Sequence, residues 1–386
     1  MQVDRSDDKH RSVSPPIYQT ATFEQPTATE FGEYDYSRSG NPTRDLLEKK
    51  LAELEHGKYA AAFSSGMAAI TAVTRLLENG DAILASDDLY GGSVRLLEKV
   101  LPRQGLAVSY VDSANIEEFE AAFLPETKLV LIETPTNPLL RISDISKLSA
   151  IAHSRGALLA VDNTMLSPCL QNPLDLGADI VIHSATKFLC GHSDVTAGAI
   201  VTNDKDLADR IAFTQNAEGT ALAPFDSWLL NRGLKTLALR VERQSDSALR
   251  IARFLLDEPS IKNVYYPALA DGAAAEVHNA QATGGGAVIS FTTDDPEFSR
   301  RLVEAAELCT IAVSFGSVNS TISLPCHMSH ASIPQHLRNR LAPSPDLIRL
   351  SVGIEDADDI IEDLEKAIRV AGHSEYRETA ALTAVG

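Results

Sequence analysis

The chain has 386 residues, of which 44% are hydrophobic and 23% are charged, proportions that are usual for a soluble globular protein and exclude a disordered or fibrous one. It carries 53 acidic residues against 34 lysines and arginines, a formal net charge of −19, so we expect neither nucleic acid nor an anionic membrane as a partner. The first ten residues mix acids and bases, and no apolar run is long enough to span a membrane, so we expect neither a secretory signal nor a membrane helix.

From residue 66 onward, apolar runs alternate with amphipathic segments. The apolar runs predict strands, and the amphipathic segments predict helices. In chain order, we predict helix 66–77, strand 81–85, helix 92–101, strand 106–111, helix 116–123, strand 128–133, helix 142–154 and strands 157–162, 179–183 and 197–201. This alternation predicts an α/β fold with a mainly parallel sheet that helices cover on both faces.

The pattern changes after Pro224. A long helical stretch over 226–256, with Gly233 as the expected bend, leads into a smaller α/β region. That region contains predicted strands 262–266, 287–292, 310–314 and 348–352 and predicted helices 297–307 and 356–370. The first residues are rich in proline, threonine, serine and tyrosine and have no helical period. We therefore predict three parts: an arm over 1–43 that contacts a neighbouring subunit, a large domain over 44–235 and a small C-terminal domain over 236–386.

The four cysteines are widely spaced. This usage is typical of reduced thiols and predicts a cytoplasmic location. The segment from Cys326 to His330 contains one cysteine and two histidines, but their spacing fits no usual zinc pattern. We therefore expect no metal.

The strongest candidate for a reactive side chain is Lys187. It follows the predicted strand 179–183 in the sequence HSATK. A lysine at the carboxyl end of a strand can form a Schiff base with an aldehyde cofactor, and the hydroxyl groups of Ser184 and Thr186 can bind a phosphate. A lone lysine in a polar loop is more often only solvent-exposed, but the surrounding residues favour the reactive interpretation.

Asp162 ends the predicted strand 157–162. Because ligands of open α/β sheets bind beyond the carboxyl ends of the strands, Asp162 and Lys187 can converge from different strands. A carboxylate that faces a pyridine nitrogen would keep it protonated, so that the ring accepts electrons. The alternative interpretation is a turn aspartate that precedes Asn163 and Thr164.

Two further features suit a flat, phosphorylated cofactor. Ser65, Gly66 and Met67 open the predicted helix 66–77 and can offer backbone N–H groups to a phosphate, although Ser65 is also an ordinary helix cap. Tyr90 lies in a loop before a helix and can stack on a ring, or it can be an ordinary turn tyrosine. With Lys187 and Asp162, these residues make up the set of groups that pyridoxal 5′-phosphate (PLP) requires.

The chain resembles the Cys/Met metabolism PLP-dependent enzymes, the family of cystathionine γ-synthases, cystathionine β- and γ-lyases and methionine γ-lyases. The resemblance runs from residue 14 to residue 367. It is carried by the motifs YSRSGNPT (36–43), SGMAA (65–69), ETPTNP (133–138), HSATKFLCGHSD (183–194) and IRLSVGIED (348–356). It implies the type I fold of PLP-dependent transferases, in which a large domain with a mainly parallel sheet between helices precedes a smaller α/β domain.

The resemblance also implies roles for individual residues. Lys187 would hold PLP as a Schiff base and move protons, Asp162 would pair with the ring nitrogen, and Tyr90 would stack on the ring. Its other implied cofactor residues would bind the phosphate or lie near the phenolic oxygen: Gly66, Met67, Ser184, Thr186, Asn137, and Tyr36 and Arg38 from a neighbouring subunit. Substrate binding would fall to Arg349, which would grip the α-carboxylate, with Ser314 and Asn137 beside it. The implied assembly is a homo-oligomer, a dimer that shares active sites and is commonly doubled to a tetramer.

Within the family, the chain is most similar to plant-type cystathionine β-lyases, in segments such as PIYQTATFEQPTATE (16–30) and SFGSVNS (314–320). We therefore expect a carbon–sulfur β-lyase that cleaves cystathionine, or a similar sulfur amino acid, to a thiol such as homocysteine, pyruvate and ammonia. The alternatives are a γ-acting relative (γ-synthase or γ-lyase) and a specialised lyase for a secondary-metabolite thioether. Asn319 weakens the γ-lyase alternative, because many γ-acting relatives carry glutamate there. A non-catalytic protein on this scaffold would not need Lys187, Asp162 and Arg349 together.

Overall fold

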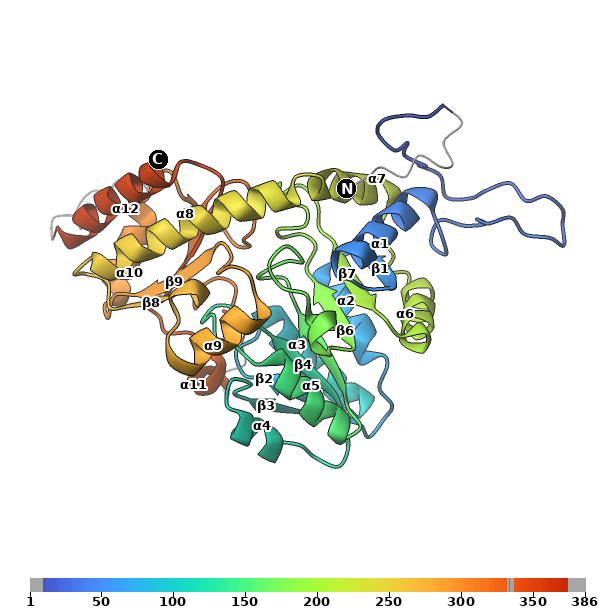
Figure 1. Ribbon diagram of the computed structural model, residues 1–386, viewed down its shortest axis with the longest axis horizontal. Helices are drawn as coiled ribbons and strands as arrows, with labels where there is room; N and C mark the ends of the chain where they lie inside the picture. Colours follow the sequence, from blue (N-terminus) through green and yellow to red (C-terminus); the bar gives the residue numbers. More distant parts are fainter. Residues whose placement is uncertain (1–9, 332, 334–336, 374–386) are drawn as a thin grey trace, which may run out of the picture.

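The computed structural model describes residues 10–331, 333 and 337–373. Figure 1 shows two sheets, each with its own helices, and a long helix that runs past both. Within the described part of the chain, no helix is long and apolar enough to cross a membrane.

The larger sheet has seven strands in the order β1-β7-β6-β5-β4-β2-β3. β7 runs antiparallel to both of its neighbours, and the other adjacent pairs are parallel. The strands are β1 (Tyr59–Phe63), β2 (Ala82–Ser86), β3 (Ala107–Val111), β4 (Thr127–Glu133), β5 (Leu158–Asp162), β6 (Ile180–His183) and β7 (Gly198–Thr202). Every residue of β2, β6 and β7 is buried, as expected for strands that helices cover on both faces.

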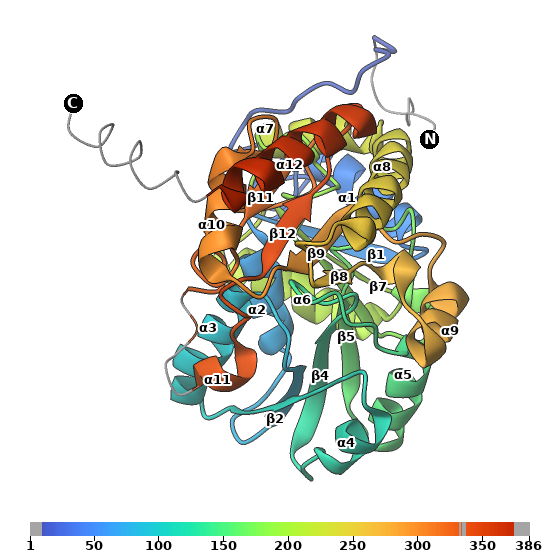
Figure 2. The same ribbon diagram turned by 90° about the vertical axis from the view of Figure 1, so that its left-hand side faces the viewer.

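Helices from different parts of the chain cover the two faces of this sheet (Figure 2). One face packs against α2 (Gly66–Thr74), α3 (Gly91–Lys99) and α6 (Lys205–Glu218). The other face packs against α1 (Pro42–Leu54), α4 (Ile116–Ala121), α5 (Ile145–Ser154) and α7 (Pro224–Leu234). Short 3₁₀ turns at Leu101–Gln104, Pro173–Leu176 and Pro267–Leu269 complete the connections.

The smaller sheet has the strand order β10-β11-β12-β9-β8. Only β10 and β11 pair in parallel. Its strands are β8 (Asn263–Tyr265), β9 (Val288–Thr292), β10 (Thr310–Ile311), β11 (Thr321–Ser323) and β12 (Ile348–Ser351). The helices of this region are α8 (Leu237–Asp257), α9 (Gly272–Gln281), α10 (Pro296–Ala305), α11 (Arg338–Leu341) and α12 (Ala357–Gly372).

Helix α8 connects the two cores. Leu237 and Val241, near its start, pack in the core beside β6 and β7, whereas Ala248 and Ile251 pack in the core of the smaller sheet. Its buried residues recur every three or four positions, which is the period of one helical face. One continuous helix therefore fixes the smaller sheet beside the larger one.

The predicted α/β fold class is confirmed, but some element predictions are wrong. The helix predicted over 226–256 is two helices, α7 and α8, and Gly233 lies inside α7 rather than at a bend. A Cβ atom at Gly233 would lie 2.4 Å from the carbonyl oxygen of Cys190, so glycine is needed there for close packing. The strand predicted over 310–314 ends at Ile311, and Ser314 cannot belong to it, because its φ of 83° is one that extended chain does not adopt.

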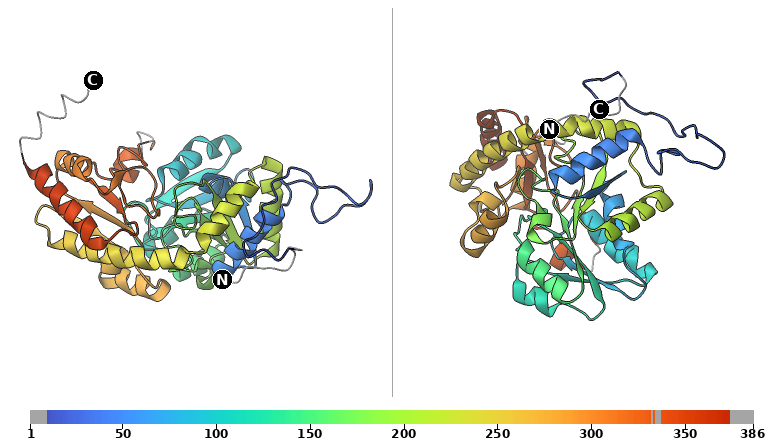
Figure 3. Two further views of the ribbon diagram at one scale, coloured as in Figure 1. Left: turned by 90° about the horizontal axis from the view of Figure 1, so that it is seen from above. Right: turned by 45° about the vertical axis from the view of Figure 1, so that its right-hand side comes forward.

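The sequence patterns also missed several short or weakly periodic elements: α1, β1, α6, α9, β11 and α11. Residues 10–41 contain no helix, and a bridge between Thr22 and Tyr36 is their one strand-like pairing. Figure 3 shows this segment extending away from the two sheets. The division into an arm and two domains at residues 43 and 235 stays a prediction.

Candidate active site

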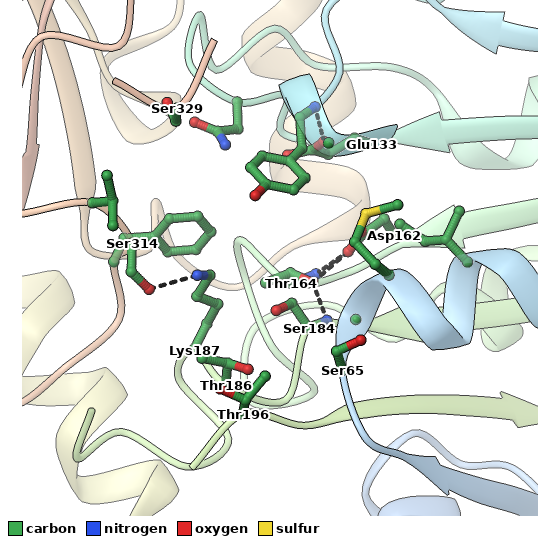
Figure 4. A pocket seen from close by; sticks show the side chains of 18 of the residues that line it. Ser65, Glu133, Asp162, Thr164, Ser184, Thr186, Lys187, Thr196, Ser314 and Ser329 are labelled. Atoms are coloured by element: carbon green, nitrogen blue, oxygen red, sulfur yellow. Dashed lines mark hydrogen bonds between the residues drawn. The ribbon is translucent and has the colours of Figure 1, made fainter. Parts of the chain in front are cut away.

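A pocket of about 470 Å³ opens at the carboxyl ends of β4, β5 and β6, between the two sheets. The larger sheet and α2 supply one side of it, and the loop after β10 and strand β12 supply the other. The predicted site residues that line it are Gly66, Met67, Tyr90, Asn137, Asp162, Ser184, Thr186, Lys187, Ser314 and Arg349. Figure 4 shows Asp162, Ser184, Thr186, Lys187 and Ser314 around this pocket.

Lys187 lies in the turn that follows β6. The backbone N–H of Lys187 donates to the carbonyl of Ser184 at 3.0 Å, and the amine Nζ donates to Ser314 Oγ at 2.5 Å. Burial, together with the charge of Arg349, lowers the pKa of Lys187 to about 8. An amine with that pKa is partly neutral near physiological pH, so it can attack an aldehyde or accept a proton.

Asp162, at the end of β5, is held by its neighbour Thr164. The backbone N–H of Thr164 donates to Asp162 Oδ1 at 3.0 Å, and the Thr164 hydroxyl donates to the same oxygen. The hydroxyl also accepts the N–H of Ser184 at 2.8 Å, so it ties the end of β5 to the loop that carries Lys187. Burial raises the pKa of Asp162, and the bonds from Thr164 oppose that rise. A cation such as a protonated ring nitrogen would complete the site.

The N-terminus of α2 forms a seat for an anion. The Ser65 side chain accepts the N–H of Ala68 at 3.1 Å, and within the described chain no hydrogen bond uses the N–H groups of Gly66 and Met67. A Cβ atom at Gly66 would lie 2.8 Å from Ser184 Cβ, so only glycine lets this helix end approach the lysine loop. Free N–H groups at a helix start suit a phosphate.

Tyr90 and Thr186 both line the pocket, but their contacts differ. The backbone N–H of Tyr90 donates to Glu133 Oε2 at 3.2 Å, and its ring lies so close to Gly92 that a Cβ atom there would clash with it. The ring is partly exposed, as a stacking surface must be. The Thr186 hydroxyl already pairs with the backbone of Ala197.

Arg349 projects from β12 and is 2% exposed. Its Nη1 donates to Asn137 Oδ1 at 2.8 Å, and its Nη2 donates to the carbonyl oxygen of Ser314 at 2.9 Å. Its guanidinium carbon also lies 5.3 Å from the centre of the Phe315 ring. Burial lowers the pKa of Arg349 to about 10, which leaves it charged at neutral pH. Among the described residues, no carboxylate pairs with it within 4.0 Å, so it is available to an anionic ligand.

The structure does not place Tyr36 and Arg38 at this pocket. Tyr36 is 42% exposed, and Arg38 Nε donates to Asn216 Oδ1 of α6 at 3.0 Å. Their predicted action from a neighbouring subunit stays a prediction.

Sequence reasoning missed Glu133, Thr164 and Arg95, which also line the pocket. Glu133 ends the apolar strand β4 and begins the ETPTNP motif, so its place at a strand end was the available signal. Thr164 had a similar signal, because it stands two residues after Asp162. Nothing in the pattern around Arg95, an exposed residue of α3, marks it as part of a site.

The donor set of the pocket fits PLP. A helix start can seat the phosphate, Lys187 can take the aldehyde, Asp162 can face the ring nitrogen, and Tyr90 can cover the ring. Each of these residues lines the one pocket, so no rearrangement of the chain is needed to bring them together.

Comparisons with known proteins agree with this chemistry. The sequence profile of the Cys/Met metabolism PLP-dependent enzymes matches residues 1–369. A chloroplastic cystathionine beta-lyase of Arabidopsis thaliana is 53% identical over 95% of this chain and 79% of its own length. A cystathionine gamma-lyase of Bacillus subtilis is 49% identical over 94% of this chain and 96% of its own. The crystal structure of cystathionine gamma-lyase from Lactobacillus plantarum, complexed with L-serine, superimposes with a TM-score of 0.91 at 42% identity, covering 93% and 94% of the two chains.

Proposed function

Because the chain belongs to the Cys/Met metabolism PLP-dependent enzyme family, we propose that it is a carbon–sulfur β-lyase for cystathionine or a similar thioether amino acid. With cystathionine and one water, the products are homocysteine, pyruvate and ammonia. The observation that carries the proposal is the convergence of Lys187, Asp162 and Arg349 in one pocket. PLP, the cofactor of the family, supplies an electron sink that allows Cα–H cleavage and departure of a group from Cβ.

Substrate binding starts at Arg349. Its two hydrogen bonds go to neutral oxygens of Asn137 and Ser314, so a substrate α-carboxylate gives it a stronger partner without leaving another charge unpaired. The adjacent Phe315 ring excludes water from one side of the guanidinium. This arrangement orients the amino acid with its Cα toward Lys187.

Proton transfer falls to Lys187 Nζ. With a pKa of about 8, the amine can take a proton from Cα and can return one to the departing sulfur, because its two protonation states are close in free energy near neutral pH. The hydrogen bond to Ser314 fixes the position of the amine in the pocket. Asp162 meanwhile holds the proton on the ring nitrogen, which keeps the cofactor electron-poor.

The experiment that tests this function is a product assay. Purified protein with L-cystathionine should release pyruvate and homocysteine in equal amounts. Release of 2-oxobutyrate and cysteine, without pyruvate, would reject β-elimination in favour of the γ-acting alternative. An assay of cystine and of other thioether conjugates then ranks the leaving groups.

We further propose that two copies share their active sites and that the assembly is a homotetramer. This is supported by the exposed arm, which carries Tyr36 and Arg38, and by large apolar side chains at the surface, among them Phe31, Phe213 and Leu239, each at least 70% exposed. Light scattering of wild type and of Arg38→Ala, with cofactor affinity measured on both, tests the assembly and the shared site. A cytoplasmic location is a separate proposal, which rests on the four free cysteines.

A further inference from the structure

Two carboxyl groups stand side by side in the pocket, and only one of them has a role in the proposed chemistry. Glu133 and Asp162 are Cα partners at the ends of the parallel strands β4 and β5. Residues in register on neighbouring strands point to the same face of a sheet, and both of these line the pocket. Figure 4 shows both side chains at its wall. Glu133 is only 4% exposed.

The surroundings of Glu133 offer little to stabilise a negative charge. Among the described residues, its carboxyl group accepts a single hydrogen bond, from the backbone N–H of Tyr90 at 3.2 Å. The positive charge of Arg349 acts on it, but both donating nitrogens of Arg349 bind other oxygens. Within the described chain, no lysine, arginine or histidine forms an ion pair with Glu133. A third buried carboxyl group, that of Asp88, adds to the negative charge nearby.

Asp162 has more groups around it that stabilise a negative charge than Glu133 has. It accepts two hydrogen bonds from Thr164, and the charge of Lys187 also favours its ionised form. Burial and the charges of Asp162 and Asp88 raise the pKa of Glu133 well above its usual range. Two adjacent buried carboxyl groups do not both ionise when one proton can be kept between them.

We propose that Glu133 and Asp162 together carry a single negative charge, with Glu133 as the protonated member. Glu133 is then a positioning residue: its neutral carboxyl group holds the backbone of Tyr90 in place. Its neutrality leaves Asp162 as the only anion of the pair at the ring nitrogen. It also leaves Arg349 open to the substrate, whereas an ionised Glu133 would compete for that cation. The inference rests on the proposed function only for the identity of the ring.

Infrared difference spectroscopy of the holoenzyme tests the protonation state directly. At mildly alkaline pH, subtraction of Glu133→Gln from wild type should show the loss of the carbonyl band of a protonated carboxylic acid. Glu48 is the control, because it is a half-buried acid outside the pocket that likewise accepts a backbone N–H, from Ala62 at 2.8 Å, and its pKa is raised only to about 7. Above that pH, Glu48→Gln should show the loss of carboxylate bands. Loss of carboxylate bands in Glu133→Gln would overturn the proposal.

Cofactor affinity gives a second readout that needs no turnover. Glutamine is neutral and keeps an acceptor for Tyr90, so Glu133→Gln should change the dissociation constant of PLP by less than about fivefold, the effect of one neutral hydrogen bond. Glu133→Ala should weaken binding more, and Asp162→Asn, which removes the required charge, by about tenfold or more. A loss in Glu133→Gln equal to that in Asp162→Asn would overturn the proposal. If these affinities are as expected but cystathionine yields no pyruvate, the β-lyase function is rejected and the proposed protonation of Glu133 stands.

Discussion

Lys187 and Ser314 lie in loops that follow strands of different sheets, yet Lys187 Nζ lies 2.5 Å from Ser314 Oγ. Lys187 follows β6 of the larger sheet, and Ser314 follows β10 of the smaller one. Ser314 reaches the lysine in a left-handed backbone conformation, with φ at 83°, which a residue with a side chain adopts only when its surroundings impose it. The packing of the two sheets therefore fixes the position of the reactive amine. Variants of Lys187 test the role of that amine.

Replacement of Lys187 by alanine removes both the amine that takes the aldehyde and the base that moves protons. We expect lyase activity to fall at least about a thousandfold, within the usual contribution of a positioned acid–base group. The visible absorption of the purified protein should shift to that of PLP bound without a covalent link. Lys205→Ala is the control, because Lys205 is an exposed residue of α6 that pairs with Asp209. Unchanged activity and absorption in Lys187→Ala would refute the proposed role.

The lowered pKa of Lys187 predicts how the apoenzyme takes up its cofactor. Only the neutral amine attacks an aldehyde, and burial lowers the pKa of Lys187 to about 8. The rate of PLP uptake should therefore rise with pH up to about pH 8 and then level off. Stopped-flow absorbance at several pH values measures it. A rate that keeps rising toward pH 10, as for an ordinary lysine, would contradict the lowered pKa.

The close approach of Gly66 to Ser184 predicts the effect of one added methyl group. In Gly66→Ala, the new Cβ would lie 2.8 Å from Ser184 Cβ and 2.9 Å from Ser184 Cα. One of the two chain segments must then shift, and the N–H groups at the start of α2 move with it. We expect PLP to bind about tenfold more weakly, from the loss of charge-assisted hydrogen bonds. Gly372→Ala is the control, because nothing lies within 4 Å of its Cβ position. Equal PLP affinities in the two variants would argue against the phosphate seat.

The larger sheet's side of the pocket could be predicted from the sequence, because ligands bind at the carboxyl ends of strands. Lys187, Asp162 and Gly66 were found because each lies beside a run whose period predicts a strand or a helix. Arg349 and Ser314 were placed in the site only by the family resemblance. They lie in the smaller sheet region, far along the chain from Lys187, and no local sequence pattern indicates that β12 and the loop after β10 pack beside β6.

The register of the strands escaped prediction altogether. Glu133 gains its importance from being the Cα partner of Asp162, and a one-residue change in register would turn it to the other face. Thr164 likewise matters because its hydroxyl reaches Ser184 in another loop. Hydrophobic patterns predict which residues form strands, but they do not predict which residues become neighbours across them.

Arg349 should govern the binding of substrate more than that of PLP. In Arg349→Ala, the substrate carboxylate loses a buried partner, and we expect kcat/KM for cystathionine to fall about 30-fold or more, mainly through KM. Arg349→Lys should recover only part of the loss, because lysine lacks the planar pair of donors. Arg243→Ala, which removes an exposed arginine on α8, is the control. A normal KM in Arg349→Ala would show that the carboxylate binds elsewhere.

His330 predicts a loss of stability in mild acid. Its Nε2 donates to the carbonyl oxygen of Asn137 at 3.2 Å, and it is 2% exposed. Burial and the charge of Arg349 lower its pKa to about 4, against about 6.5 in the unfolded chain. Between these values, the unfolded state binds more protons than the folded state, so the free energy of unfolding falls as pH decreases from about 6.5 to about 4.

The comparison that isolates His330 is between wild type and His330→Gln, in which the amide can still donate to Asn137. The difference between the thermal midpoints of the two proteins should depend on pH. Between neutral pH and pH 5, the midpoint of wild type should fall relative to that of His330→Gln, because the buried imidazole resists protonation. A pH-independent difference between wild type and His330→Gln would mean that the imidazole is not held neutral beside Arg349.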